Sequence, residues 1–371
     1  MKQYIVIGAG ILGASTAYHL AKSGANVTVI DRHDPGQATD AAAGIICPWL
    51  SQRRNKAWYS LAKSGAAYYT SLIQQLEEDG ETETGYKQVG AISLHIDEEK
   101  LNKMESRATL RREDAPEIGD ISQKSAEDTA KLFPPLSDEF GSVHISGAAR
   151  VNGRALRQSL VQASKKYGVI FIQGSAEIVV HDNQITGVTV GETLYEADYV
   201  IVTAGAWADQ LLSPLGLQLK LSAQKAQIVH LQLENKSTEL WPVVMPPNDQ
   251  YILAFDEGRI VIGATHEDNQ NFDLRVTAGG LHNIFNKALS IAPGLSDSEV
   301  IETRVGYRPF TPNFLPIIGE VPGFKGLFLA NGLGASGLTV GPFLGAQLAN
   351  LVLGHPVSLD LSLYPVSDAI Q

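Results

Sequence analysis

Apolar positions over the first thirty residues predict a strand, a glycine-rich turn, a helix and a second strand. A short apolar run at residues 4–7 precedes the turn, and small and apolar residues recur at helical spacing over 14–21. A second apolar run at 27–30 then ends at an acid, Asp31. This order of elements is typical of a βαβ unit with two parallel strands.

Three glycines in the turn have the spacing of a dinucleotide-binding loop. Gly8 permits the tight turn, Gly10 lets a pyrophosphate approach the backbone, and Gly13 lets the helix pack closely on the strand. The free N–H groups at the start of the helix favour phosphate groups. Asp31 has the spacing of an acid that binds a ribose hydroxyl, which favours FAD or NAD over NADP, although Arg32 beside it weakens this exclusion. The unit does not distinguish FAD from NAD.

Further along the chain, helical periodicity and short apolar runs predict a mixture of helices and strands. The predicted helices cover residues 58–78, 98–112, 125–132, 153–167, 207–212, 278–291 and 343–353. The predicted strands cover residues 89–96, 169–171, 176–181, 184–190, 193–195, 197–203, 227–233, 251–255, 259–263, 298–307 and 326–330. Buried strands that alternate with helices indicate an α/β fold, and the other runs of strands indicate antiparallel sheets.

Small residues gather at three further points where the chain could approach a ligand. They occupy most of 38–44, they follow the strand 197–203 at 204–206, and they form a second glycine-rich segment at 331–342 before a helix. For 38–44, ordinary tight packing of a helix would explain the pattern equally well. A second helix N-terminus directed at a ligand suggests a cofactor with more than one anionic or carbonyl group, such as ring O2 of a flavin.

Composition limits the class of protein. The 371 residues suit two domains, and 44% hydrophobic with 19% charged residues describe a globular chain. A net charge of −11, spread along the chain, argues against nucleic acid as a partner. The one basic cluster, at Arg53, Arg54 and Lys56, is interpreted as a solvated loop.

The single cysteine, Cys47, excludes an internal disulfide and a metal site built from cysteines, which fits a reducing cytosol. No His or Lys adjoins it, so we expect a buried, unreactive thiol. The N-terminal apolar run belongs to the fold rather than to a signal peptide. Outside it we identify no uncharged apolar run of about 18 residues, and we therefore expect no transmembrane helix. We further expect no bound metal and a cytoplasmic protein.

Six segments, in this order along the chain, resemble the D-amino-acid oxidase family of flavoproteins, and within it the glycine oxidases most closely. They are GAGILG with Asp31, TDAAAGI, TAGAW, the pair YIL and GRIVIGAT, YRPFTPNFLPIIG, and NGLGASGLTVGP. The resemblance covers essentially the whole chain and implies an α/β protein with a Rossmann-like FAD-binding domain and an α+β substrate-binding domain with a mainly antiparallel sheet. The first domain would take residues 1–85, 142–220 and 306–371, and the second 86–141 and 221–305.

The resemblance also implies which residues meet the cofactor and the substrate. The implied FAD contacts are Gly8, Gly10, Ile11, Leu12, Gly13, Asp31, Arg32, Ala38, Thr39, Ala43, Gly44, Ile45, Glu177, Thr203, Ala204, Gly205, Leu333, Gly334, Ala335, Ser336, Gly337, Leu338 and Thr339. For the substrate, Arg308 and Tyr251 would hold a carboxylate, because a guanidinium suits that forked geometry. His266 stands where glycine oxidases have an apolar residue over the substrate. Two further departures are Pro246 in place of a tyrosine and Ala335 in place of an arginine.

The implied reaction is FAD-dependent oxidative deamination of glycine, sarcosine or a D-amino acid. Hydride transfer to flavin N5 would give an imine, then a keto acid and ammonia, with oxygen as the acceptor and H2O2 as a product, and no side chain need act as base. Three alternatives stay open: a dehydrogenase that passes electrons to a quinone or carrier, an NAD-dependent dehydrogenase, and a non-catalytic flavin-binding protein. The expected partners are the small substrate and an electron acceptor, and a homo-oligomer is compatible with the sequence.

Overall fold

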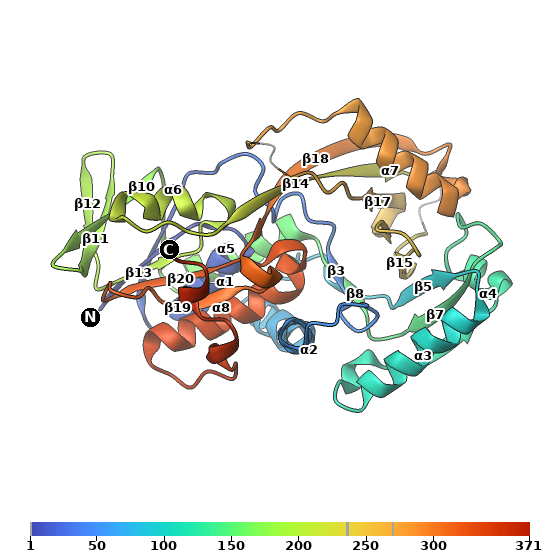
Figure 1. Cartoon of the computed structure of the whole chain (residues 1–371), viewed down its shortest axis with the longest axis horizontal. Helices are drawn as coiled ribbons and strands as arrows, with labels where there is room; N and C mark the ends of the chain where they lie inside the picture. The colour runs from blue at the N-terminus through green and yellow to red at the C-terminus, as the bar shows by residue number, and fades with distance from the viewer. Residues whose placement is uncertain (1, 235–236, 269–270) are drawn as a thin grey trace.

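Two large sheets organise the chain, which the computed structural model describes for residues 2–234, 237–268 and 271–371 (Figure 1). The first sheet has six strands in the order β19 (Ile317–Glu320), β20 (Leu327–Asn331), β13 (Tyr199–Val202), β1 (Gln3–Ile7), β2 (Asn26–Asp31) and β9 (Ile170–Gln173). Neighbouring strands are parallel except for β19 and β20.

Both faces of this parallel sheet are covered, which explains the continuous apolar runs of its central strands. Successive side chains point to opposite faces. Val6 of β1 packs in the cluster of α1 (Ile11–Lys22) and α8 (Gly337–Leu353), and α8 also contacts α2 (Lys56–Glu78). Ile5 packs instead with residues of α6 (Ala208–Leu212) and of a small antiparallel sheet. That sheet contains β10 (Ala176–His181), β11 (Gln184–Val190) and β12 (Thr193–Glu196) and lies at the left of Figure 1.

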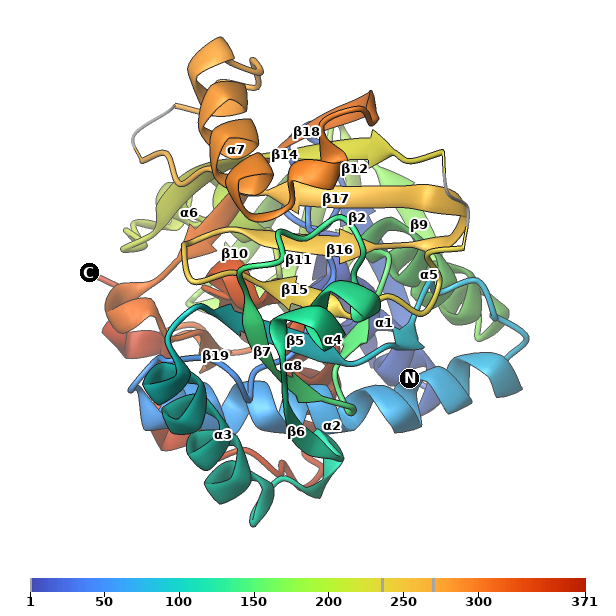
Figure 2. The same cartoon turned by 90° about the vertical axis from the view of Figure 1, so that its right-hand side faces the viewer.

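The second large sheet joins two segments of the chain that are distant in sequence (Figure 2). Its order is β18 (Glu299–Phe310), β14 (Ser222–Gln232), β17 (Arg259–Gly263), β16 (Tyr251–Ala254), β15 (Val243–Met245), β5 (Ala91–His95), β7 (Gly141–Ile145) and β6 (Ile121–Lys124). Only β15 and β5 are parallel, and their pairing connects the two segments. Three helices pack against this sheet: α3 (Glu98–Arg112), α4 (Ala126–Leu132) and α7 (Ala278–Ile291).

The predicted fold class is confirmed, and the differences lie in short elements and in element ends. The strands β6, β7, β15 and β19 were not predicted, and neither was a small sheet formed by β3 (Ile45–Ile46), β8 (Ala149–Arg150) and β4 (Lys87–Gln88). Except for β7, which has five residues, each has two to four, too few for an alternating pattern to appear. The helix predicted over 153–167 is α5 (Gly153–Lys166), which packs on α1. The predicted domain boundaries stay a prediction, and the one at residue 306 falls within β18.

The prediction that the last long helix begins at residue 343 is wrong, because α8 begins at Gly337 and includes Pro342. A proline inside a helix donates no hydrogen bond to the carbonyl four residues before it. That carbonyl belongs to Leu338, and it accepts a hydrogen bond of 2.6 Å from the Tyr69 hydroxyl of α2. The partner helix thus satisfies the group that the proline leaves without a donor.

The chain does contain an uncharged apolar run of more than about 18 residues beyond its N-terminus, contrary to the prediction. Gly334–Leu353 is long and apolar enough to cross a membrane by length and composition. However, 72% of its apolar window is buried within the protein, where it packs against α1 and α2. Its apolar character is that of a core helix.

The glycine at position 65 allows α2 to approach the start of α8. A Cβ on Gly65 would come within 2.3 Å of the Thr339 carbonyl oxygen. We expect Gly65→Ala to cost about 1–3 kcal/mol, as overpacking does, and to lower the midpoint of thermal unfolding. Gly279→Ala in α7 is the matched control, since a Cβ there meets nothing within 4 Å, and it should leave the midpoint unchanged or raise it. Equal midpoints for the two variants would show that this helix contact is not tight.

Candidate functional site

A cavity of about 1160 Å³ collects almost all of the predicted site residues. Its walls come from the β1–α1 turn, the chain after β2, the end of β13, strands β14, β16 and β18, and the segment before α8. All three predicted substrate residues line it, and so does every predicted cofactor residue except Gly13. The structure therefore brings together side chains from both large sheets.

Gly13 lies behind the wall of the cavity, where it sets the position of α1. A Cβ on Gly13 would lie 1.9 Å from the Gly8 carbonyl oxygen and 2.5 Å from Thr203 Oγ1. The Thr203 hydroxyl in turn lies 3.0 Å from the carbonyl oxygens of Ile7 and Gly8. Gly8 itself has φ +101°, a conformation that glycine adopts without strain. The turn is thus held against the end of β13 with no space for side chains.

The start of α1 fits an anionic group. Gly10 provides no side-chain cap, and no acid occupies the first turn. A Cβ on Gly10 would contact only Thr39 Oγ1, at 3.4 Å, so the backbone is open towards the cavity. The positive end of the helix dipole and the backbone N–H groups favour a phosphate at such a position.

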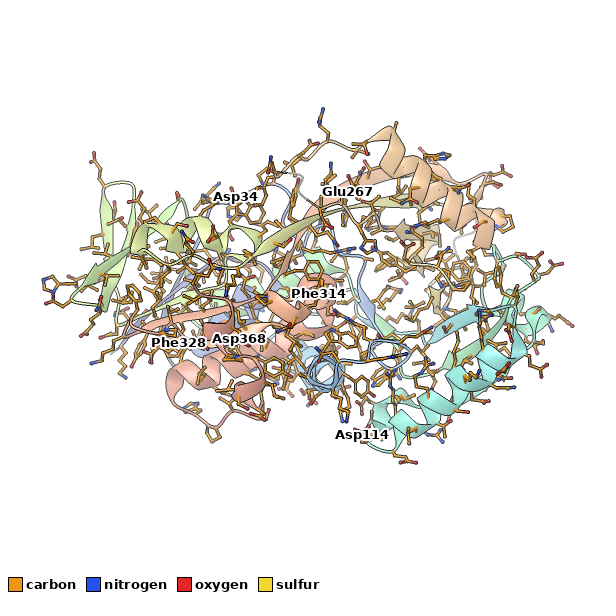
Figure 3. All side chains as sticks on the ribbon, in the orientation of Figure 1. Asp34, Asp114, Glu267, Phe314, Phe328 and Asp368 are labelled. Carbon is orange, nitrogen blue, oxygen red and sulfur yellow. The ribbon has the colours of Figure 1, made fainter. Side chains whose placement is uncertain are left out.

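Asp31 ends β2 with an ordered and mostly buried carboxylate. Its Oδ2 accepts a hydrogen bond of 2.5 Å from Ala9 N, while Oδ1 accepts bonds from His33 N at 2.5 Å and Gln37 Nε2 at 3.2 Å. A carboxylate has about four acceptor positions, so one is left for a ribose hydroxyl. Arg32 pairs with Asp34 at 2.8 Å, and Asp34 is labelled in Figure 3.

The segment before α8 and the first turn of α8 are each held by a side-chain hydrogen bond. Trp58 Nε1 donates to Ser336 Oγ at 3.0 Å, and Thr339 Oγ1 donates to the Ile45 carbonyl at 3.0 Å. The N-cap of α8 carries no side-chain hydrogen bond, and no acid lies in its first turn. A carbonyl with partial negative charge could therefore bind at this helix end, as flavin O2 requires.

The predicted substrate residues lie together at one end of the cavity, and one of them is an arginine without a carboxylate partner among the described residues. Arg308 of β18 forms no ion pair with an Asp or Glu in the described part of the chain. Its Nη1 lies 3.0 Å from His266 Nδ1 and 3.4 Å from Gln224 Oε1. Burial lowers the pKa of Arg308, and the adjacent Tyr251 opposes this shift. The guanidinium therefore has its charge available for an anionic ligand.

Tyr251 and His266 complete this end as neutral groups. Burial raises the pKa of Tyr251, so its hydroxyl keeps its proton and can donate to a carboxylate. Burial and the charge of Arg308 lower the pKa of His266 below its usual 6.5. At neutral pH the ring is thus uncharged, and Nδ1 accepts the hydrogen bond from Arg308 while Nε2 carries the proton.

Comparison with known proteins identifies the family. A family model described as "DAO: FAD dependent oxidoreductase" matches residues 3–351. The chain belongs to this family. It is therefore an FAD-dependent oxidoreductase that acts on amino acids or amines. The choice between FAD and NAD is resolved in favour of FAD, and the non-catalytic alternative is excluded.

Relatives in the DAO family extend over the whole chain. The chain is 64% identical to the uncharacterized oxidoreductase YurR of Bacillus subtilis (strain 168), with 100% of both chains covered. It is 28% identical to the glycine oxidase of Pseudomonas aeruginosa, with 98% of both covered. Its structure resembles the crystal structure of iminodiacetate oxidase (IdaA) from Chelativorans sp. BNC1, with a TM-score of 0.95, 46% identity and 98% of both chains covered.

Several cavity residues were not predicted from the sequence. They include Gln37, Cys47, Trp58, Trp207, Gln210, Met245 and Asp249. Trp207 was placed at the start of a helix, yet its ring stacks on Phe272 with centroids 5.2 Å apart at the cavity wall. The segment TAGAW could have indicated it, since ligands bind at the carboxyl ends of the strands in open α/β sheets. Cys47 is buried as predicted, and burial raises the pKa of its thiol to about 12.

The contact between His266 and Arg308 generates a prediction about substrate binding. His266→Leu removes the acceptor that orients the guanidinium, so we expect KM for the substrate to rise about tenfold, near the 1.5 kcal/mol of a hydrogen bond to a charged group. His266→Gln keeps an acceptor and should stay within about threefold of the wild type. Steady-state kinetics on FAD-loaded protein measures both. Equal KM values for the Leu and Gln variants would contradict an orienting role for His266.

Proposed function

We propose that this chain oxidises the carbon–nitrogen bond of a small amine that carries a carboxylate on the same carbon, with oxygen as the electron acceptor. The observation that supports this proposal best is the guanidinium of Arg308 inside the cavity, which has no carboxylate partner among the described residues and lies beside the neutral hydroxyl of Tyr251. A planar guanidinium matches the two oxygens of a carboxylate.

The names of two relatives narrow the proposed substrate class. One is a glycine oxidase and another is an iminodiacetate oxidase. Glycine and iminodiacetate share an amine attached to a CH2 group that carries a carboxylate. We infer that this aminoacetate unit is the part of the substrate that enters the cavity, and that the second substituent on nitrogen differs. The higher identity to the iminodiacetate oxidase favours an N-substituted glycine.

The proposed mechanism assigns binding rather than proton transfer to the side chains. FAD, when bound, would supply the acceptor for a hydride, which carries both electrons, from the CH2 carbon. The nitrogen loses a proton, and water would hydrolyse the resulting imine to a keto acid and an amine. Arg308 would hold the carboxylate, Tyr251 would donate a hydrogen bond to it, and His266 would orient Arg308. Because the amine must lose its proton before oxidation, activity should rise with pH. A cytoplasmic location and a homo-oligomer stay predictions from the sequence.

Arg308→Lys tests this assignment. A lysine keeps the charge but loses the forked contact, so we expect unchanged FAD content and a KM about 10- to 100-fold higher, which corresponds to about 1.5–3 kcal/mol. Arg275→Lys is the control, because Arg275 is exposed and pairs with Asp273 outside the cavity. Oxygen uptake and peroxide formation with iminodiacetate, sarcosine and glycine provide the measurement. An unchanged KM would remove Arg308 from the substrate site, and oxidation without peroxide would exclude oxygen as the acceptor.

A further inference from the structure

A second cavity, of about 600 Å³, adjoins the first and contains mostly basic side chains. It lies between the chain before α2, the first turns of α2 and the last turns of α3. Its cations are Arg53, Arg54, Lys56, Lys63, Arg107 and Arg111. Asp114 is its one acid, and Figure 3 labels it beside α2. Six cations around one space are notable in a chain whose net charge is −11.

Most of these cations lack an anionic partner. Of these six cations, only Lys63 forms an ion pair with another described residue, which is Asp114 at 2.7 Å. Arg111 donates instead to the backbone carbonyls of Trp49 and Ser51, and its guanidinium lies 4.5 Å from the Tyr59 ring centroid. Like charges held close together repel one another, so an anion in this cavity would relieve the repulsion.

Tyr59 lines the same cavity and carries an unused hydroxyl. Its oxygen is buried and has no hydrogen-bond partner among the described residues. Burial raises its pKa to about 12, so the group is a hydroxyl that can donate. Buried polar atoms in proteins are almost always paired, and an anionic oxygen would supply the missing acceptor.

Arg53 connects this basic cavity to the cofactor cavity, because it lines both. Its guanidinium lies 4.7 Å from the centroid of the Trp58 ring. Trp58 in turn donates its hydrogen bond to Ser336 in the segment before α8. The two cavities therefore meet at Arg53, near the segment before α8 where the flavin ring is proposed to lie. Arg53 and Arg54 lie in an exposed loop, as predicted, and Lys56 begins α2; the placement of α3 beside them is what the sequence did not indicate.

We propose that the basic cavity is an anion-binding site that receives the carboxylates of the incoming substrate and selects amines with more than one carboxylate. The proposal rests on the proposed function in taking the substrate to be a carboxylate-bearing amine. At neutral pH glycine has no net charge, whereas iminodiacetate has one net negative charge. A positively charged entrance therefore attracts iminodiacetate and not glycine. It raises the association rate of iminodiacetate by about 10-fold or more at low salt.

The first test measures binding without turnover. Diglycolate, which has an ether oxygen in place of the amine of iminodiacetate, is titrated calorimetrically into the FAD-loaded protein at about 20 mM salt. We compare the double variant Arg54→Gln/Arg107→Gln with the control Lys100→Gln/Lys220→Gln. Both control lysines are exposed, line neither cavity and form no ion pair with the described residues. The first pair should weaken binding about tenfold and the control pair less than twofold. Equal affinities, or no binding to the wild type, would overturn the proposal.

The second test is kinetic and separates the two proposals. Flavin reduction by iminodiacetate should slow in the Arg54→Gln/Arg107→Gln variant and in high salt, because ions screen charges beyond about one Debye length. Reduction by glycine or sarcosine should change less than twofold. If no amine reduces the flavin while diglycolate binding still depends on Arg54 and Arg107, the proposed function fails and the anion site stands. If flavin reduction slowed equally with iminodiacetate, glycine and sarcosine, the proposed anion-binding site would be contradicted.

Discussion

The close contact between α1 and the ends of β1 and β13 is the constraint on which the rest of the structure depends. Gly13 lies against the Gly8 carbonyl and the Thr203 hydroxyl, so the helix can start only at one distance from the sheet. That distance opens the backbone at Gly10 towards the cavity and brings Asp31 beside Ala9. A second tight contact, of Gly65 with Thr339, sets the start of α8 at the other end of the cavity.

The second sheet contributes charged and polar side chains to the cavity, whereas the first sheet contributes mainly backbone groups. β14 pairs with β18 and places Gln224 opposite Arg308, while β17 leads the chain to His266. These groups surround a guanidinium that no carboxylate neutralises in the described residues. In a chain of net charge −11, Arg308 at this end of the cofactor cavity and five of the six cations of the basic cavity have no carboxylate partner among the described residues. The charge distribution therefore favours an anionic substrate over a neutral one.

Most of the predicted site residues line one cavity, because the features that pointed to them are backbone features with strict spacing. Glycines at 8, 10 and 13 and the acid at 31 depend on local geometry, which a single βαβ unit encodes. The predicted substrate residues depended on the family resemblance, since a lone arginine or tyrosine carries no pattern. The start of α8 could not be predicted, because Tyr69 on another helix satisfies the Leu338 carbonyl. The role of the cations at 53, 54 and 56 likewise needed α3 to be placed beside them.

The central claim is that an FAD-loaded chain oxidises an amine whose carboxylate binds beside the flavin. The most direct measurement is anaerobic mixing of the purified protein with iminodiacetate, sarcosine, glycine, D-amino acids and amines without a carboxylate, while the flavin absorbance is recorded. The account predicts that aminoacetates bleach the flavin and that amines without a carboxylate do not. Bleaching by simple amines alone, or no bleaching by any compound while dithionite still reduces the flavin, would contradict it.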